Sequence, residues 1–124
     1  MTNSMGPFAR AHASRLRKKL VKQIRHAAKH TDERAIHDLR VAIRRFSQCL
    51  EEFHQFFPAG RTKKIRKRLK KLMHLAARTR DRDVALELIG ATSPDLAADL
   101  KLEREQACRT LSRSLARRRN RELA

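Results

Sequence analysis

Residues 33–57 read ERAIHDLRVAIRRFSQCLEEFHQFF and carry the clearest helical pattern in the chain. Apolar side chains recur there every three or four residues without a break, which is the spacing of one buried face of a bundle helix. The preceding residues 31–33, Thr-Asp-Glu, supply a helix N-cap and first-turn acids, and Pro58 and Gly60 are expected to end the helix. The apolar positions are Ile36, Leu39, Ile43, Phe46, Leu50, Phe53 and Phe57. The stretch therefore predicts a long helix with one narrow buried face.

Similar but weaker patterns on both sides of this stretch predict three more long helices and one short helix. Their expected spans are about 8–30, from about 62 onward, 79–89 for the short helix, and from 93 onward. In the last helix, the residues expected to face the core are Leu96, Leu100, Ala107, Leu111 and Leu115. Short connections between long helices make neighbouring helices antiparallel. We therefore predict an all-α protein, an antiparallel helical bundle of four long helices plus one short helix.

The charge of the chain is large and unevenly distributed. The 124 residues hold 31 Lys and Arg against 13 Asp and Glu, a formal net charge of +18. Residues 1–31 and 61–74 each carry eight basic residues and no acidic residue. So large an excess repels itself and favours binding to a polyanion. The length suits a single domain over 1–124, with an N-terminal tail at 1–7 and a basic C-terminal tail at 117–124.

The composition excludes several classes of protein. Three Gly and three Pro in the whole chain argue against an all-β fold and against a Gly-rich nucleotide-binding fold. No apolar run is long enough to span a bilayer, and the N-terminus lacks the pattern of a signal peptide. Cys49 and Cys108 are far apart and have no CxxC partner, which is typical of reduced thiols. These features predict a cytoplasmic protein that does not bind membranes.

A row of cationic side chains runs beside the buried face of the helix at 33–57. At about 100° per residue, His37, Arg40 and Arg44 fall on a strip about 60° wide, whereas Asp38 and Arg45 lie elsewhere on the helical wheel. Planar guanidinium groups in a row suit phosphate oxygens because each can donate two hydrogen bonds. The alternative is a solvated basic face in which His37 is bonded to a neighbouring helix.

Two other helices carry rows of basic residues at helical spacing. Both rows lie in segments that no acidic residue interrupts, which leaves two interpretations open: an anion-binding role and ordinary solvated faces. The row on the first helix is Arg15, Lys18, Lys22, Arg25 and Lys29, with His26 adjacent, and the row on the third is Lys63, Lys67, Lys70 and His74.

Nothing in the sequence indicates catalysis, a metal or a cofactor. His26 and His30 have the spacing of a helical metal pair, but no Cys or carboxylate lies near them in the sequence. Asp81 and Asp83 are two residues apart on a predicted helix, so they point in different directions and cannot act as a paired acid and base. Asp81 is instead expected to orient a facing arginine, and Asp38 is expected to have a structural role. The sequence therefore predicts a protein that is not an enzyme.

Two motifs resemble those of CHAD domains, the conserved-histidine α-helical domains. Residues 36–46, IHDLRVAIRRF, resemble the first signature of that family, and residues 80–84, RDRDV, resemble the second. The resemblance implies an all-helical fold that binds inorganic polyphosphate without catalysis, at polyphosphate granules. It also implies that the motif positions His37, Arg40, Arg44 and Arg45 take part in binding. Early suggestions for the family treated its histidines as metal ligands or phosphate acceptors.

The chain departs from the family pattern at three points. It has Ser47 where the family usually has Arg, and Ala76-Ala77 where the family usually has Leu-Gly. Without that glycine, one kinked or continuous helix is the alternative to a separate short helix after the third. Members typically contain two helical units in tandem, whereas this chain corresponds to one half of such a fold. A symmetric homodimer is therefore expected, with the row of His37, Arg40 and Arg44 facing its mate around a polyanion.

The sequence thus predicts non-catalytic polyphosphate binding, and two other functions stay open. One is a small basic protein that binds nucleic acid, which the same charge would support. Against it, the chain has no Trp or Tyr, and its five Phe are expected to lie mostly on the buried face. The other is an accessory subunit of an enzyme that processes polyphosphate or triphosphate.

Overall fold

The computed structural model describes residues 2–89 and 92–117, and within these ranges all its regular elements are helices. The four α-helices are long, and a short 3₁₀ helix joins the second to the third. These elements are α1 (Thr2–Lys29), α2 (Glu33–Glu52), η1 (His54–Phe56), α3 (Ala59–Ile89) and α4 (Pro94–Ala116). The predicted all-α class is confirmed.

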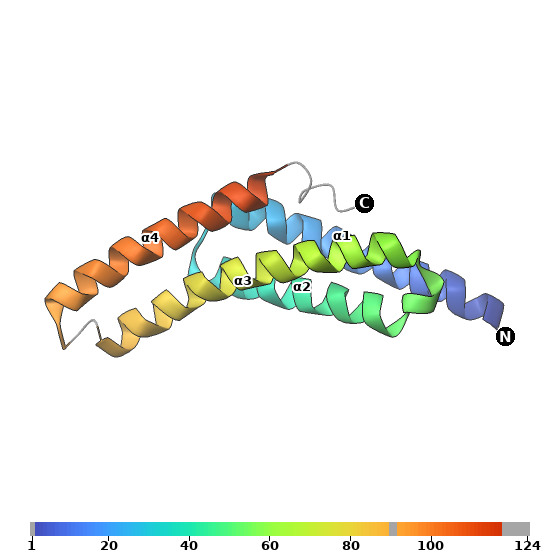
Figure 1. Cartoon of the computed structure of the whole chain (residues 1–124), viewed down its shortest axis with the longest axis horizontal. Helices are drawn as coiled ribbons and strands as arrows, with labels where there is room; N and C mark the ends of the chain where they lie inside the picture. Colours follow the sequence, from blue (N-terminus) through green and yellow to red (C-terminus); the bar gives the residue numbers. More distant parts are fainter. Residues whose placement is uncertain (1, 90–91, 118–124) are drawn as a thin grey trace.

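The four helices form an antiparallel bundle in which each helix packs mainly on two others (Figure 1). Going around the bundle, α1 packs on α2, α2 on α3, α3 on α4, and α4 returns to α1. Short connections force this arrangement, because a chain that turns within a few residues must place the next helix alongside the last. The molecule is therefore an elongated bundle of four helices.

Two predicted caps start the helices where the sequence placed them. The Asp32 carboxylate accepts a hydrogen bond from the backbone N–H of Ala35 at 2.8 Å, at the start of α2. At the start of α4, the Ser93 hydroxyl accepts from the N–H of Leu96 at 3.4 Å, with Pro94 at the first helical position. Each cap satisfies a backbone donor that the first turn leaves without a partner.

The core follows the apolar pattern of α2. Five of the seven predicted positions on that helix are buried, while Phe53 and Phe57 pack against the core from its edge. All four α-helices contribute to the core. Its largest fully buried apolar side chains are Leu20, Ile24, Ile36, Leu39, Leu69, Leu72, Leu111 and Leu115.

The helix α3 is continuous, so the predicted short helix that began at Thr79 does not exist as a separate element. The Thr79 hydroxyl donates to the Leu75 carbonyl at 3.3 Å, which is a bond within a helix and not an N-cap. No Gly or Pro occurs between Gly60 and Ile89, and Ala76 and Ala77 are strong helix formers. The short helix of the structure is η1, which lies before α3 and not after it.

Two predicted boundaries differ from the structure. The helix α2 ends at Glu52, before the Pro58 and Gly60 that were expected to end it, because the chain turns through η1 first. The helix α1 begins at Thr2, so residues 2–7 of the predicted N-terminal tail are part of that helix. Of the predicted C-terminal tail, residues 118–124 lie outside the described residues.

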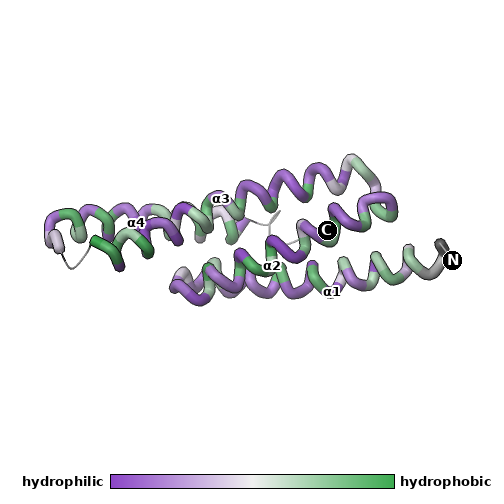
Figure 2. Tube along the Cα trace, turned by 90° about the horizontal axis from the view of Figure 1, so that it is seen from below, coloured by the Kyte–Doolittle hydropathy of each residue, from purple (hydrophilic) through white to green (hydrophobic). Residues whose placement is uncertain are grey.

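The α3–α4 hairpin extends beyond the α1–α2 hairpin at one end of the bundle (Figures 1 and 2). Because α3 has 31 residues and α2 has 20, its far end has no α2 to pack on. No described residue between 80 and 107 is buried. The prediction that Leu96 and Leu100 face the core is therefore wrong, since Leu96 is 52% exposed and Leu100 is half-buried.

The phenylalanines are less buried than the sequence indicated. Only Phe46 is buried, and Phe8 is 52% exposed. The Phe8 ring stacks on His12 with centroids 5.9 Å apart and meets Phe53 edge-on at 6.1 Å. The expectation that the phenylalanines lie mostly on the buried face holds for three of the five, because Phe46 is in the core and Phe53 and Phe57 pack against it, whereas Phe8 is exposed.

Candidate anion-binding site

A groove between α2 and α3 collects four of the residues that the sequence singled out. We call it the α2–α3 groove; its volume is about 860 Å³. Ile43, Leu69 and Met73 line its floor, and polar and basic side chains line its walls. Its basic residues are Arg44, Lys63, Arg66, Lys67 and Lys70. Five basic side chains against one carboxylate, Glu51, make it a cationic groove.

Two ion pairs link α2 and α3 at the surface. Arg66 Nη2 is 3.7 Å from Glu51 Oε2 near one end of the helix pair, and Arg80 Nη1 is 2.5 Å from Glu33 Oε1 at the other. All four side chains are substantially exposed, so each pair contributes little to stability, about 0–1 kcal/mol. They leave most of the basic side chains of the groove without a carboxylate partner among the described residues.

Arg40 lies one turn before Arg44, on the side of α2 that faces α3. Its Nε is buried and has no hydrogen-bond partner among the described residues, although the residue as a whole is half-exposed. The base of the guanidinium is therefore covered by neighbouring atoms, while the residue as a whole is only partly buried. A cation covered in this way loses less side-chain entropy when it binds an anion than a freely rotating one.

His37 occupies a separate shallow concavity of about 570 Å³ at the start of α2. Glu33, Arg34, Asp38 and Arg80 line the same concavity. The predicted row therefore runs along the α3-facing edge of α2, from His37 through Arg40 to Arg44 in the α2–α3 groove. This edge spans about 10 Å at 1.5 Å per residue.

A second cationic groove lies between α1 and α2, and Arg45 belongs to it. We call it the α1–α2 groove; its volume is about 320 Å³. Lys19, Lys22 and Arg45 line it together with the carboxylate of Asp38. The motif residues Arg44 and Arg45 are thus in different grooves, although they are adjacent in the sequence.

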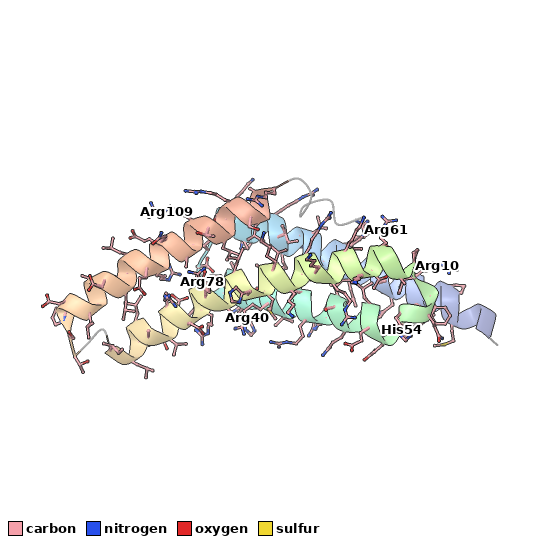
Figure 3. The ribbon with its side chains drawn as sticks, viewed as in Figure 1. Arg10, Arg40, His54, Arg61, Arg78 and Arg109 are labelled. Atoms are coloured by element: carbon pink, nitrogen blue, oxygen red, sulfur yellow. The ribbon has the colours of Figure 1, made fainter. Side chains whose placement is uncertain are left out.

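The other predicted residues lie outside both grooves. Arg15, Lys18 and Arg25 are exposed on α1, on the side of that helix opposite its buried positions. His74 is exposed on α3 and continues the row of Lys63, Lys67 and Lys70. Figure 3 shows cationic side chains on every α-helix, among them Arg10 on α1, Arg40 on α2, Arg61 and Arg78 on α3, and Arg109 on α4.

The sequence analysis missed four residues that line these surfaces. Lys19 lines the α1–α2 groove, Arg66 lines the α2–α3 groove, and Arg34 and Arg80 lie beside His37. Helical spacing alone could have found three of them. Lys19 is three residues from Lys22, Arg66 lies within one turn of Lys63 and Lys70, and Arg34 is three residues before His37.

The second motif, residues 80–84, contributes a structural contact through Asp83. Asp83 Oδ1 accepts a hydrogen bond from Arg104 Nε on α4, and Arg104 Nη2 donates to the Thr31 carbonyl at 3.1 Å. This hydrogen bond to Asp83 raises the pKa of Arg104 further above its ordinary value. The carboxylate that orients a facing arginine is thus Asp83, whereas the predicted Asp81 is exposed.

The described residues give no group of three or more His, Cys, Asp or Glu side chains able to hold a metal ion. The rings of His26 and His30 lie with centroids 4.9 Å apart, and both residues are exposed. Cys49 is buried, and this burial raises the pKa of its thiol, with a smaller contribution from Glu52. A raised pKa keeps the thiol protonated and unreactive at neutral pH.

The fold and the grooves define a small, strongly basic, all-helical protein with cationic grooves along its bundle. No helix within the described ranges combines the length and apolarity that crossing a bilayer requires. A scan against protein-family models matches the CHAD domain over residues 11–124. The chain belongs to the CHAD family, whose domains are associated with polyphosphate- and triphosphate-related proteins. Searches of curated proteins and of solved structures found no match.

Proposed function

We propose that this protein binds inorganic polyphosphate, without catalysing a reaction, through the α2–α3 groove and the adjoining edge of α2. The observation that carries the proposal is the convergence of Arg44, Lys63, Lys67 and Lys70 on one groove from two helices. The sequence pointed to Arg44 and to the row of three lysines on separate grounds. Membership of the CHAD family supports the same ligand class.

The shape and charge of the groove suit a linear chain of phosphates. From Glu51 at one end to His37 at the other, the edge of α2 runs for about 20 Å. Lysines act as point charges along such a path, while Arg40 and Arg44 can each donate two hydrogen bonds to phosphate oxygens. Because each phosphate unit repeats the same charge, the chain can make similar contacts at every position along the groove.

Binding neutralises part of a net charge of +18, so the energy gained is largely electrostatic. A polyanion releases condensed counterions when it binds cationic side chains, as DNA does. We therefore expect tight binding at low salt and a steep loss of affinity as salt increases. The proposal includes location at polyphosphate granules, because such a ligand would recruit the protein there.

The most discriminating test is a competition between long-chain polyphosphate and duplex DNA at matched phosphate concentration. In one series labelled polyphosphate is bound first and unlabelled DNA is then added. In the other series labelled DNA is bound first and unlabelled polyphosphate is then added. The proposal predicts that polyphosphate displaces labelled DNA at a lower phosphate concentration than DNA needs to displace labelled polyphosphate. The reverse order would favour the nucleic-acid function. Release of orthophosphate during incubation with the protein alone would contradict the non-catalytic part of the proposal.

The proposal also includes a weak homodimer. Its support is the far end of the α3–α4 hairpin, where exposed apolar side chains gather: Leu88, Ile89, Leu96 and Leu102. Residues 81–106 hold seven acidic and three basic residues, so this end does not share the positive charge of the bundle. Two copies that meet there would keep their basic grooves apart, unlike the facing rows expected from the resemblance. Measurement of the mass in solution, with and without polyphosphate, tests this part; a strict monomer in both conditions would contradict it.

A further inference from the structure

Arg44 and Arg45 are consecutive residues of α2 that line two different grooves. Arg44 lies in the α2–α3 groove and Arg45 in the α1–α2 groove. Consecutive residues of an α-helix project about 100° apart around its axis, so neighbouring arginines on an outer face reach opposite flanks. The helix α2 therefore presents a guanidinium group to each side.

Both grooves have the same kind of lining. Three basic side chains and one carboxylate line the α1–α2 groove, and five basic side chains and one carboxylate line the α2–α3 groove. Each groove has an apolar floor made by the two helices that it separates, with Leu16 and Val41 in the first and Ile43 and Leu69 in the second. Lys19, Lys22 and Arg45 are all exposed, so a large anion can reach the smaller groove as well as the larger.

The ridge of α2 separates the two grooves. An α-helix with its side chains is about 10–12 Å across, which exceeds the Debye length of about 8 Å at physiological ionic strength. A phosphate chain bound in one groove therefore repels a chain in the other only weakly. The positive charge of the protein exceeds the charge that a phosphate chain bound in one groove can neutralise. The second groove therefore still attracts anions after the first is filled.

We infer that one copy of this protein binds two polyphosphate strands at once, one in each groove, and so bridges them. The inference rests on the proposed function for the ligand class, and it adds a second site and an activity. A bridging protein links separate phosphate chains into a network. When a protein is bound to one strand through one groove, its other groove is held at a high local concentration near neighbouring strands. The activity is therefore the cross-linking of polyphosphate chains.

Energy transfer between differently labelled chains tests the inference. Long-chain polyphosphate is prepared in two batches, one labelled at its end with a donor fluorophore and the other with an acceptor. The two batches are mixed and titrated with the wild-type protein. The protein concentration runs from below the molar concentration of polyphosphate chains to far above it. Bridging predicts energy transfer that rises at low protein concentration and falls in excess protein, when single strands become coated. Binding measured in parallel without any energy transfer would overturn the inference and leave the proposed function intact, whereas no binding at all would overturn both.

Three matched triple variants assign the bridging to the two grooves. One removes three charges from the α1–α2 groove, one removes three from the α2–α3 groove, and the control removes three exposed charges outside both. The variants are Lys19→Gln/Lys22→Gln/Arg45→Gln, Lys63→Gln/Lys67→Gln/Lys70→Gln and, as the control, Lys64→Gln/Lys71→Gln/Arg109→Gln.

The inference predicts that each groove variant still binds polyphosphate but loses most of the energy transfer, at least about fivefold relative to the control. The control retains a transfer curve with the wild-type shape. A dimer would still bridge through its two α2–α3 grooves after the α1–α2 groove is removed, so transfer is measured at protein concentrations at which the mass in solution is that of the monomer. Persistence of transfer in the α1–α2 variant under those conditions overturns the inference. Equal losses in all three variants would overturn it too, because they would show bridging by diffuse charge.

Discussion

Arg104 on α4 donates from Nε to Asp83 Oδ1 on α3, and the same guanidinium donates from Nη2 to the Thr31 carbonyl between α1 and α2. The side chains of Arg104 and Asp83 are 27% and 11% exposed, which makes theirs the least exposed ion pair among the described residues. Asp83 Oδ2 is buried and has no hydrogen-bond partner in the described part of the chain. One arginine thus ties together three segments of the bundle where the α3–α4 hairpin leaves the α1–α2 hairpin.

Replacing Arg104 by Ala should lower the free energy of unfolding by about 2 kcal/mol, because it leaves the half-buried Asp83 carboxylate without its partner. Urea denaturation monitored by circular dichroism measures the loss. The control is Asp81→Asn, which should change the stability by less than about 0.5 kcal/mol because Asp81 is exposed. Equal stability of the Arg104→Ala variant and the wild type would show that the contact does not stabilise the fold.

The double variant Arg40→Ala/Arg44→Ala should weaken polyphosphate binding by at least about tenfold, since charge-assisted hydrogen bonds contribute about 1.5–3 kcal/mol each. The matched control is Arg109→Ala/Arg113→Ala, which removes two exposed arginines from α4, outside both grooves. It should weaken binding by about threefold or less. Titration by fluorescence anisotropy gives both affinities, and similar losses in the two double variants would mean that the charge acts without a defined site.

The stagger of the two hairpins predicts unequal costs for two leucines on the same helix. Leu111→Ala removes a fully buried side chain and should cost about 2–5 kcal/mol of stability. Leu102 is 63% exposed at the far end of the hairpin, so Leu102→Ala should cost less than about 0.5 kcal/mol. Denaturation of the two variants under identical conditions measures both. A large cost at Leu102 would mean that a partner covers this end in solution.

The pKa of the Cys49 thiol is raised above its ordinary value by burial, so the folded protein binds this proton more tightly than the unfolded chain does. The resulting stabilisation is complete below the unfolded-state pKa of about 8.5 and is lost as the pH rises through the higher folded-state pKa. Stability should therefore fall between pH 8 and pH 10 by more in the wild type than in Cys49→Ala. Denaturation at both pH values measures the two differences, and identical pH dependence in the two proteins would rule out this role for Cys49.

The helices could be predicted from the sequence because their signals are local. The spacing of Ile36, Leu39 and Ile43 indicates a buried face whatever the helix packs against, and a cap such as Asp32 acts within four residues. The break expected at Thr79 failed because a threonine before a charged run fits both an N-cap and a helix interior. Only the helix-forming Ala76 and Ala77 nearby favour continuity.

The site was harder to predict because a groove is a property of two helices. The wheel of α2 separated Arg44 from Arg45, but only the positions of α1 and α3 show that each arginine has a groove of its own. The exposure of Leu96 has a similar origin. Its spacing fits a buried helix face. Leu96 is nevertheless uncovered, because α3 is longer than α2 and the far end of the α3–α4 hairpin has no α2 beside it.

The central claim is that defined lysines and arginines of the α2–α3 groove hold polyphosphate, and the salt dependence of binding tests it most directly. The logarithm of the affinity is measured against the logarithm of the salt concentration for three proteins. They are the wild type, Lys63→Gln/Lys67→Gln/Lys70→Gln and the control Lys64→Gln/Lys71→Gln/Arg109→Gln. Each lost phosphate contact should reduce the slope by about one.

The account predicts a slope shallower by about three in the groove variant and by less than about one in the control. The same reduction in both variants, or a slope in the groove variant equal to that of the wild type, would contradict the claim that this groove binds the phosphate chain.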